Sequence, residues 1–141
     1  MEERAGLRTV ASDRPAGETV DRLESAISEA GFGIFARVDH AAEAAKVGMR
    51  LPPTVLVMFG NPRVGTHLMQ DRQSTGIDLP TKVLVWEDED GRAWLTYNDP
   101  AWIAERHELR TAHEDTGKAV AGIEASLTAI VRQAGGGSPS T

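Results

Sequence analysis

The sequence contains no cysteine among its 141 residues. This absence excludes a disulfide framework, a zinc site with cysteine ligands, a thiolate nucleophile and thiol redox chemistry. Aromatic residues make up only 5% of the chain, and the longest apolar run covers residues 55–59. That run is far shorter than the roughly 20 residues of a membrane span. Because the polar N-terminus also lacks the apolar stretch of a signal peptide, we expect a cytoplasmic protein.

Basic residues are outnumbered: 15 Lys and Arg stand against 21 Asp and Glu, for a formal net charge of −6. Affinity for nucleic acid and for anionic membranes depends on basic patches, so neither is an expected partner. The rest of the composition, 40% hydrophobic and 26% charged, is that of an ordinary globular protein. The length fits one domain.

Composition shifts along the chain divide it into three parts. Residues 1–12 form a mixed, polar leader whose residues 7–11 alternate weakly and could be an edge strand. Residues 13–134 carry the periodic patterns of a single domain. Residues 135–141 are rich in Gly, Ser and Pro, and we expect a disordered tail there.

Periodicity predicts a regular series of elements. Thr19 is the expected N-cap of the first helix, and Gly31 suits the position just after its end. The unbroken apolar run 55–59 predicts a strand covered on both faces. In chain order we expect strand 7–11, helix 19–30, strand 32–38, helix 40–46, strand 54–59, helix 62–71, a loop at 73–80, a hairpin of strands 82–87 and 93–98, and helices 100–107 and 115–134. This order favours an α+β sandwich with one largely antiparallel or mixed sheet.

The junction of residues 60–66 is the most distinctive segment. It passes from an apolar strand through Gly60 to Asn61 and Pro62, a strong helix-start pair. Free N–H groups and the positive end of a helix dipole suit an anion there, with Arg63 adding charge and Thr66 a hydroxyl. The alternative is plain helix capping without a ligand. The segment is neither a Walker A loop nor a dinucleotide fingerprint.

Asp39, His40 and Glu43 form the only tight cluster of acids with an imidazole. His40 and Glu43 share a helix face, which would suit an acid/base pair or half of a metal site. The alternative is an N-cap followed by a solvated helix face. Since the other histidines show no metal-ligand spacing, we expect no metal, and Asp39 and His40 are only weak catalytic candidates.

Trp86 and Trp94 flank the expected hairpin turn at Asp90-Gly91 and should be cross-strand neighbours. They could line a ligand cleft or build a dimer interface, where tryptophan is enriched. Simple core packing is the alternative.

The chain resembles a DUF302 domain over about two-thirds of its length, and the Gly60-Asn61-Pro62 junction and the Leu79-Pro80 segment are the most specific parts. The matching segments are residues 19–23, 35–40, 59–70, 76–82, 85–88 and 94–100. The resemblance implies a small α+β domain with a TBP-like, curved, mainly antiparallel sheet and helices on one face. It also implies a homodimer, and it leaves the biochemical role open. Arg63 and His67 stand where the family pattern has Lys and Pro.

Together these observations predict a non-enzymatic, homodimeric binding or accessory domain that uses no cofactor. One alternative is an enzyme whose Asp39 and His40 face the same cleft. Another is a purely structural dimerisation module. The residues expected to contact a small anionic or polar ligand are Gly60, Asn61, Arg63, Thr66, Trp86 and Trp94.

Overall fold

The computed structural model describes residues 4–137, so the predicted tail beyond residue 137 lies outside the described residues. The elements are β1 (Leu7–Ala11), α1 (Ala16–Glu29), β2 (Gly33–Asp39), α2 (His40–Lys46), β3 (Thr54–Gly60), α3 (Pro62–Asp71), the 3₁₀ helix η1 (Gln73–Asp78), β4 (Thr81–Glu87), β5 (Ala93–Asn98), α4 (Pro100–Arg106) and α5 (Glu114–Gly135). The five strands form one antiparallel sheet in the order β1-β5-β4-β3-β2. The predicted α+β class and the edge strand at residues 7–11 are confirmed.

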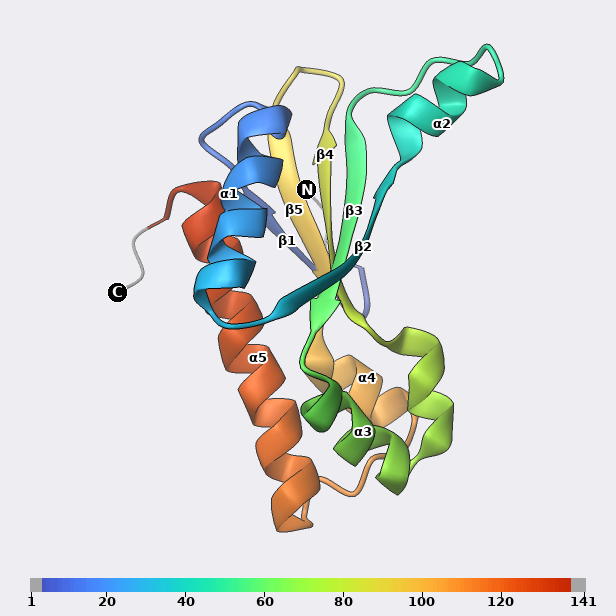
Figure 1. Cartoon of the computed structure of the whole chain (residues 1–141), viewed down its shortest axis with the longest axis vertical. Helices are drawn as coiled ribbons and strands as arrows, with labels where there is room; N and C mark the ends of the chain where they lie inside the picture. Colours follow the sequence, from blue (N-terminus) through green and yellow to red (C-terminus); the bar gives the residue numbers. More distant parts are fainter. Residues whose placement is uncertain (1–3, 138–141) are drawn as a thin grey trace.

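One face of the sheet carries the main core. Helices α1 and α5 lie side by side against it, while α3 and α4 lie beyond one end of the sheet (Figure 1). Val57, Val83 and Leu95 point toward these helices and are fully buried. They meet fully buried Leu23 and Ile27 of α1 and the apolar stripe of α5. Alternation along the three central strands β3, β4 and β5 thus places every second side chain in the core, whereas the edge strands β1 and β2 stay largely exposed.

The prediction that residues 55–59 are covered on both faces is wrong. In β3 the side chains of Val55, Val57 and Phe59 are buried, whereas Leu56 and Met58 are only half-buried on the opposite face. A short apolar run does not distinguish a doubly covered strand from a strand with an apolar but open second face. We call this second face the open sheet face; its central side chains are Leu56, Met58, Leu84, Trp86 and Trp94.

Helix α1 begins at Ala16, so the prediction of Thr19 as its N-cap is also wrong. Thr19 lies inside the helix and is fully buried. Its hydroxyl is 2.9 Å from the Pro15 carbonyl oxygen, one turn earlier, and 2.6 Å from Ser12 Oγ. A threonine that bonds back to the preceding turn satisfies its hydroxyl within a helix, and the sequence does not distinguish this from capping.

A second, smaller core cluster joins α3 and α4 to the N-terminal half of α5. Its buried members are Leu68, Ala104, Leu109, Ala119 and Val120. Ile123 of α5 packs against both clusters. Helix α5 therefore connects the sheet to the region at its end, which consists of α3, η1 and α4 and is called the end region below.

Candidate ligand-binding site

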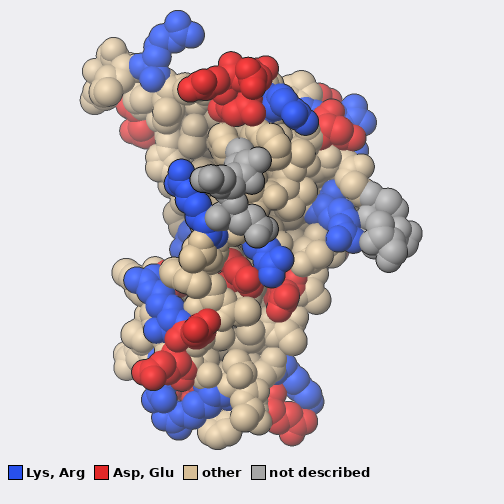
Figure 2. All heavy atoms as spheres, turned by 180° about the vertical axis from the view of Figure 1, so that it is seen from behind, with Lys and Arg blue, Asp and Glu red and all other residues tan. Residues whose placement is uncertain are grey.

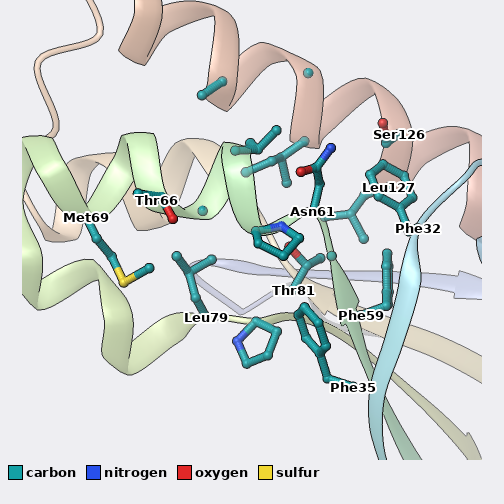
Figure 3. Close-up of a pocket in the computed structure, with 18 of the residues that line it drawn as sticks. Phe32, Phe35, Phe59, Asn61, Thr66, Met69, Leu79, Thr81, Ser126 and Leu127 are labelled. Atoms are coloured by element: carbon teal, nitrogen blue, oxygen red, sulfur yellow. The ribbon is translucent and has the colours of Figure 1, made fainter.

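A cavity of about 640 Å³ lies where the sheet meets the end region. Its walls come from the start of β2, the end of β3, α3, the segment between η1 and β4, and one face of α5 (Figure 3). Pockets that hold small molecules are commonly about 300–1,000 Å³ in volume and mostly apolar. Both the size and the position of this cavity therefore fit a small-molecule site.

The predicted junction forms one wall of the cavity. Asn61 is the N-cap of α3, and its Oδ1 accepts a hydrogen bond from the Arg63 backbone N–H at 2.9 Å. Pro62 follows at the first helical position, where its missing N–H costs nothing. This cap and proline turn the chain from β3 into α3, so that Gly60, Asn61 and Thr66 all line the cavity.

All three phenylalanines of the chain line this cavity. The rings of Phe32 and Phe59 lie 6.1 Å apart in a tilted arrangement, a contact geometry that aromatic pairs favour. Phe35 stands 53% exposed on the edge strand β2. Figure 3 shows Phe35 and Phe59 on the same side of the cavity, with Leu127 of α5 across from them.

Small residues of α5 leave the space open on the helix side. Ala119, Gly122 and Ser126 are three and four positions apart and line the cavity from one helix face. A Cβ atom added to Gly122 would have no atom within 4 Å. Glycine within a helix costs about 1 kcal/mol relative to alanine, and the missing side chain of Gly122 keeps this part of the cavity wall open.

The polar groups of the lining are few and none is acidic. They are the side chains of Asn61, Thr66, Thr81, Ser126 and Lys118. Lys118 is the only charged one, and its Nζ lies 2.8 Å from Glu114 Oε1 in an exposed ion pair. The lining therefore offers mostly apolar contacts, supplemented by hydrogen-bond donors.

Arg63, Trp86 and Trp94 do not line the cavity. Arg63 is exposed on the first turn of α3, between the lining residues Pro62 and Val64. Trp86 and Trp94 pair across the hairpin as predicted, with ring centroids 6.3 Å apart, but they belong to the open sheet face. The structure thus brings three of the six predicted ligand contacts together at the cavity and leaves the other three outside it.

The tryptophan pair is held by hydrogen bonds from both indole N–H groups. Trp86 Nε1 donates to Thr96 Oγ1 at 2.9 Å, and Trp94 Nε1 donates to Asp88 Oδ2 at 2.8 Å. The Trp94 bond, supported by backbone N–H groups of the hairpin turn, lowers the pKa of Asp88 below its ordinary value of 3.8. Seen from behind, acidic side chains gather at the top of the molecule, where this hairpin turns (Figure 2).

Asp39 and His40 lie at the opposite end of β2 from the cavity. In the β2–β3 ladder Asp39 pairs with Val55, whereas Gly33 pairs with Gly60. Six residues of extended strand separate the two ends by about 20 Å. Asp39 Oδ1 caps α2 by accepting from Ala42 N at 2.9 Å, and His40 is exposed. The geometry matches the capping alternative and does not place the pair in the same cleft as Gly60.

Sequence reasoning missed a cluster of polar contacts that ties η1 to the C-terminal end of α4. His107 Nε2 lies 2.6 Å from Asp78 Oδ2, and Arg106 Nη1 reaches both oxygens of Asp78. Ser74 Oγ lies 2.9 Å from His107 Nδ1. Nearby, the Arg110 backbone N–H donates to Asp71 Oδ2 at 2.7 Å. We call these contacts the polar clamp.

The contacts of the clamp run from Ser74 through His107 to Asp78, as in a Ser–His–Asp triad, but its geometry favours a structural tie. Ser74 is outside the lining of the cavity, and Asp78 uses both oxygens on Arg106. Asp78 directly precedes Leu79 and Pro80, which line the cavity. The clamp therefore fixes one cavity wall to α4. The residues that the clamp joins are 28 to 39 positions apart in sequence, so no local sequence motif predicts these contacts.

Two features are absent from residues 4–137. No three His, Asp or Glu side chains are grouped so that they could hold a metal ion. None of the described helices has the length and apolar character needed to cross a membrane.

Comparison with known proteins settles the family. The family model described as "Domain of unknown function DUF302" matches residues 8–130. The chain belongs to the DUF302 family. A DUF302 crystal structure, that of an uncharacterized conserved protein from Bacillus stearothermophilus, superposes with a TM-score of 0.78 at 20% identity, covering 93% of this chain and 99% of that one. At this identity the likeness supports the fold alone.

Curated relatives of this DUF302 chain are much longer than it is. A Brucella suis protein named "Fluoride-specific ion channel FluC 1" is 50% identical over 105 residues, which are 74% of this chain and 41% of that protein. A Brucella abortus protein of the same name matches equally well over 39% of its length. The chain thus spans about two-fifths of the relatives it matches.

Proposed function

We propose that this DUF302 domain is a non-enzymatic small-molecule binding domain whose site is the cavity between sheet and end region. The observation that supports this most strongly is the half-open cavity of about 640 Å³ that the junction, the three phenylalanines and α5 line. Gly60, Asn61 and Thr66 contact the ligand directly. Arg63 flanks the site and adds positive charge outside it. The enzyme alternative gains no support from the described residues, because Asp39 and His40 lie elsewhere.

Native mass spectrometry of the protein purified from its own host tests this proposal. We expect a bound small molecule on the wild type and its loss in Gly122→Leu, whose side chain fills the open space beside α5. Ala121→Leu is the matched control, since Ala121 is exposed on the same helix and outside the lining. A ligand-free wild type, or a ligand that survives in Gly122→Leu, would contradict the proposal.

We propose further that the domain acts as a homodimer through the open sheet face. The family resemblance implies a curved, TBP-like sheet, and this stays a prediction. The cytoplasmic location also stays a prediction. What supports the dimer is the apolar character of this face: Leu56, Met58, Leu84 and the stacked tryptophans lie on it and are only half-buried. Contiguous exposed apolar surface on a protein commonly marks an interaction site.

Light scattering after size-exclusion chromatography tests the dimer. Leu84→Glu, in the middle of the open sheet face, should give a monomer with an unchanged far-ultraviolet circular dichroism spectrum. Val47→Glu places the same charge at a site that is 72% exposed beyond α2 and should leave the dimer intact. A monomeric wild type at micromolar concentration would remove the dimer from the proposal.

A second proposal concerns the setting of the domain, and the names of its relatives support it. We propose that the domain is an accessory to a fluoride channel, with the channel named in the Brucella proteins belonging to the part that this chain does not cover. Removing the DUF302-like part from the Brucella suis protein should change the rate or regulation of fluoride efflux from proteoliposomes. Unchanged efflux under all conditions would argue against an accessory role.

A further inference from the structure

We infer that the ligand of the cavity is an apolar monocarboxylate, that is, an alkyl or aryl body carrying a single carboxylate. This inference rests on the proposed binding function and adds the chemical class of the ligand. Four properties of the cavity lead to it: its size, the character of its walls, the balance of hydrogen-bond donors and acceptors, and its charge.

The size of the cavity favours an occupant larger than a small inorganic ion. A water molecule takes up about 30 Å³ in the liquid, so 640 Å³ corresponds to roughly twenty groups of that size. Fluoride, phosphate or a small sugar fragment would leave most of this space to water. A molecule with a body of moderate length fills it.

The walls favour an apolar body. Phe32 and Phe59 present rings on one side, Leu79 and Met69 lie toward α3, and Leu127 lies on α5 (Figure 3). Such surfaces stabilise a ligand by removing apolar area from water. They offer nothing to a highly hydrated polar molecule, which would lose its water without compensation.

The polar atoms of the lining favour a ligand head that accepts hydrogen bonds. Asn61 already uses its Oδ1 to cap α3, which leaves the amide Nδ2 as a donor. The Lys118 ammonium can only donate. The hydroxyls of Thr66, Thr81 and Ser126 can donate or accept, and Asp, Glu and His are all missing from the lining. A carboxylate matches the donors of Asn61 and Lys118, whereas a cationic head would find no anionic side chain in the lining.

The charge of the lining favours a single negative charge. Lys118 is the one ionised side chain, and its partner Glu114 stands outside the lining. Both side chains are about three-quarters exposed, and such surface pairs contribute little because water screens them. Lys118 can therefore exchange this partner for a ligand carboxylate at small cost. A dianion would find a counterpart for only one of its charges within the lining, since Arg63 stands outside it.

Displacement of a neutral fluorescent probe, N-phenyl-1-naphthylamine, tests the class directly. Three ligands with a ten-carbon chain compete with the probe: decanoate and decyltrimethylammonium below their micelle concentrations, and 1-decanol below its solubility limit. We expect decanoate to displace the probe at a concentration at least tenfold lower than the ammonium compound, with the alcohol between them. Equal displacement by all three, or preferential displacement by the cation, would overturn the inference.

Lys118→Met isolates the contribution of the charge while keeping an apolar stem of similar length. We expect it to weaken decanoate about tenfold and to leave 1-decanol unchanged. Lys46→Met is the matched control, since Lys46 forms a similar exposed ion pair with Glu43 on α2, away from the cavity. Unchanged decanoate affinity in Lys118→Met would contradict the role of this charge.

The same probe separates failure of this inference from failure of the proposed function. Probe fluorescence that rises with wild type and Ala121→Leu, but not with Gly122→Leu, supports a binding cavity whatever the competitors do. In that case, preferential displacement of the probe by decyltrimethylammonium overturns only the inferred class of ligand. Probe that binds none of the three proteins, or all of them equally, overturns the binding function and the inference together.

Discussion

The sheet with α1 and α5 is held together differently from the end region of α3, η1 and α4. Around the sheet, fully buried aliphatic side chains such as Val57, Val83 and Leu95 form the larger core. The end region has only the small cluster around Leu68 and is tied by the polar clamp. In Figure 2 the lower half of the molecule shows acidic and basic side chains interleaved.

This difference explains where the cavity lies. A continuous apolar core leaves few voids, because its side chains interdigitate. The end region is joined to the sheet by α5, by the Gly60-Asn61-Pro62 junction and by the segment after η1, and between these connections the packing stays incomplete. The cavity therefore lies at the boundary between the sheet and the end region. One of its walls belongs to the sheet, and the facing wall is held in place by the polar clamp.

Truncation of the main core should have the largest effect. Leu95→Ala removes a fully buried side chain from the centre of the sheet and should lower the free energy of unfolding by about 2–5 kcal/mol. Urea denaturation followed by circular dichroism measures this. A decrease in the free energy of unfolding of less than about 1 kcal/mol would contradict the account, since the sheet would then not be packed more tightly than the end region.

Loss of the clamp should have an intermediate and local effect. Asp78→Asn removes the charge that pairs with His107 and Arg106, and a lost hydrogen bond to a charged group costs about 1–3 kcal/mol. We expect faster amide hydrogen exchange in residues 73–80 and weaker ligand binding, with the sheet unaffected. Glu43→Gln, which breaks an exposed pair on α2, should change neither. Exchange that is unchanged in η1 would show that the clamp does not hold the wall.

The hairpin tip should show the smallest effect, confined to acid pH. The hydrogen bond from Trp94 lowers the pKa of Asp88 in the folded protein, so the folded state binds its proton less tightly than the unfolded state does. The stabilisation is present above pH 3.8 and is lost as the pH falls through the lowered pKa. Carbon-13 NMR titration should show the pKa of Asp88 rising toward 3.8 in Trp94→Phe. A pKa that does not move would mean that this bond is not its main cause.

Local signals in the sequence predicted much of the fold. Asn61-Pro62 and Asp99-Pro100 start α3 and α4 as expected, and Asp39 caps α2. The hairpin and its tryptophan pair are confirmed as well. These features depend on residues close in sequence, where capping and turn chemistry act. The start of α1 was missed because Thr19 has the chemistry of a cap but bonds back within the helix.

The cavity could be predicted only in part, because it depends on contacts between distant segments. Gly60, Asn61 and Thr66 carry a local signal and do line it. Phe32 and Gly122 read as ordinary strand and helix residues, and only tertiary packing brings them to the same space. Gly122 is one of three glycines in α5, and glycine within a helix is a weak sign that the helix face must stay open there.

Fluorine NMR of the protein labelled at phenylalanine tests the central claim most directly. The chain has three phenylalanines, all in the cavity lining, and three tryptophans, all outside it. On titration with decanoate we expect all three fluorophenylalanine signals to shift together and to saturate, while fluorotryptophan signals in a second sample stay in place. Unmoved phenylalanine signals, or shifts at the tryptophans alone, would contradict a ligand site between the sheet and the end region.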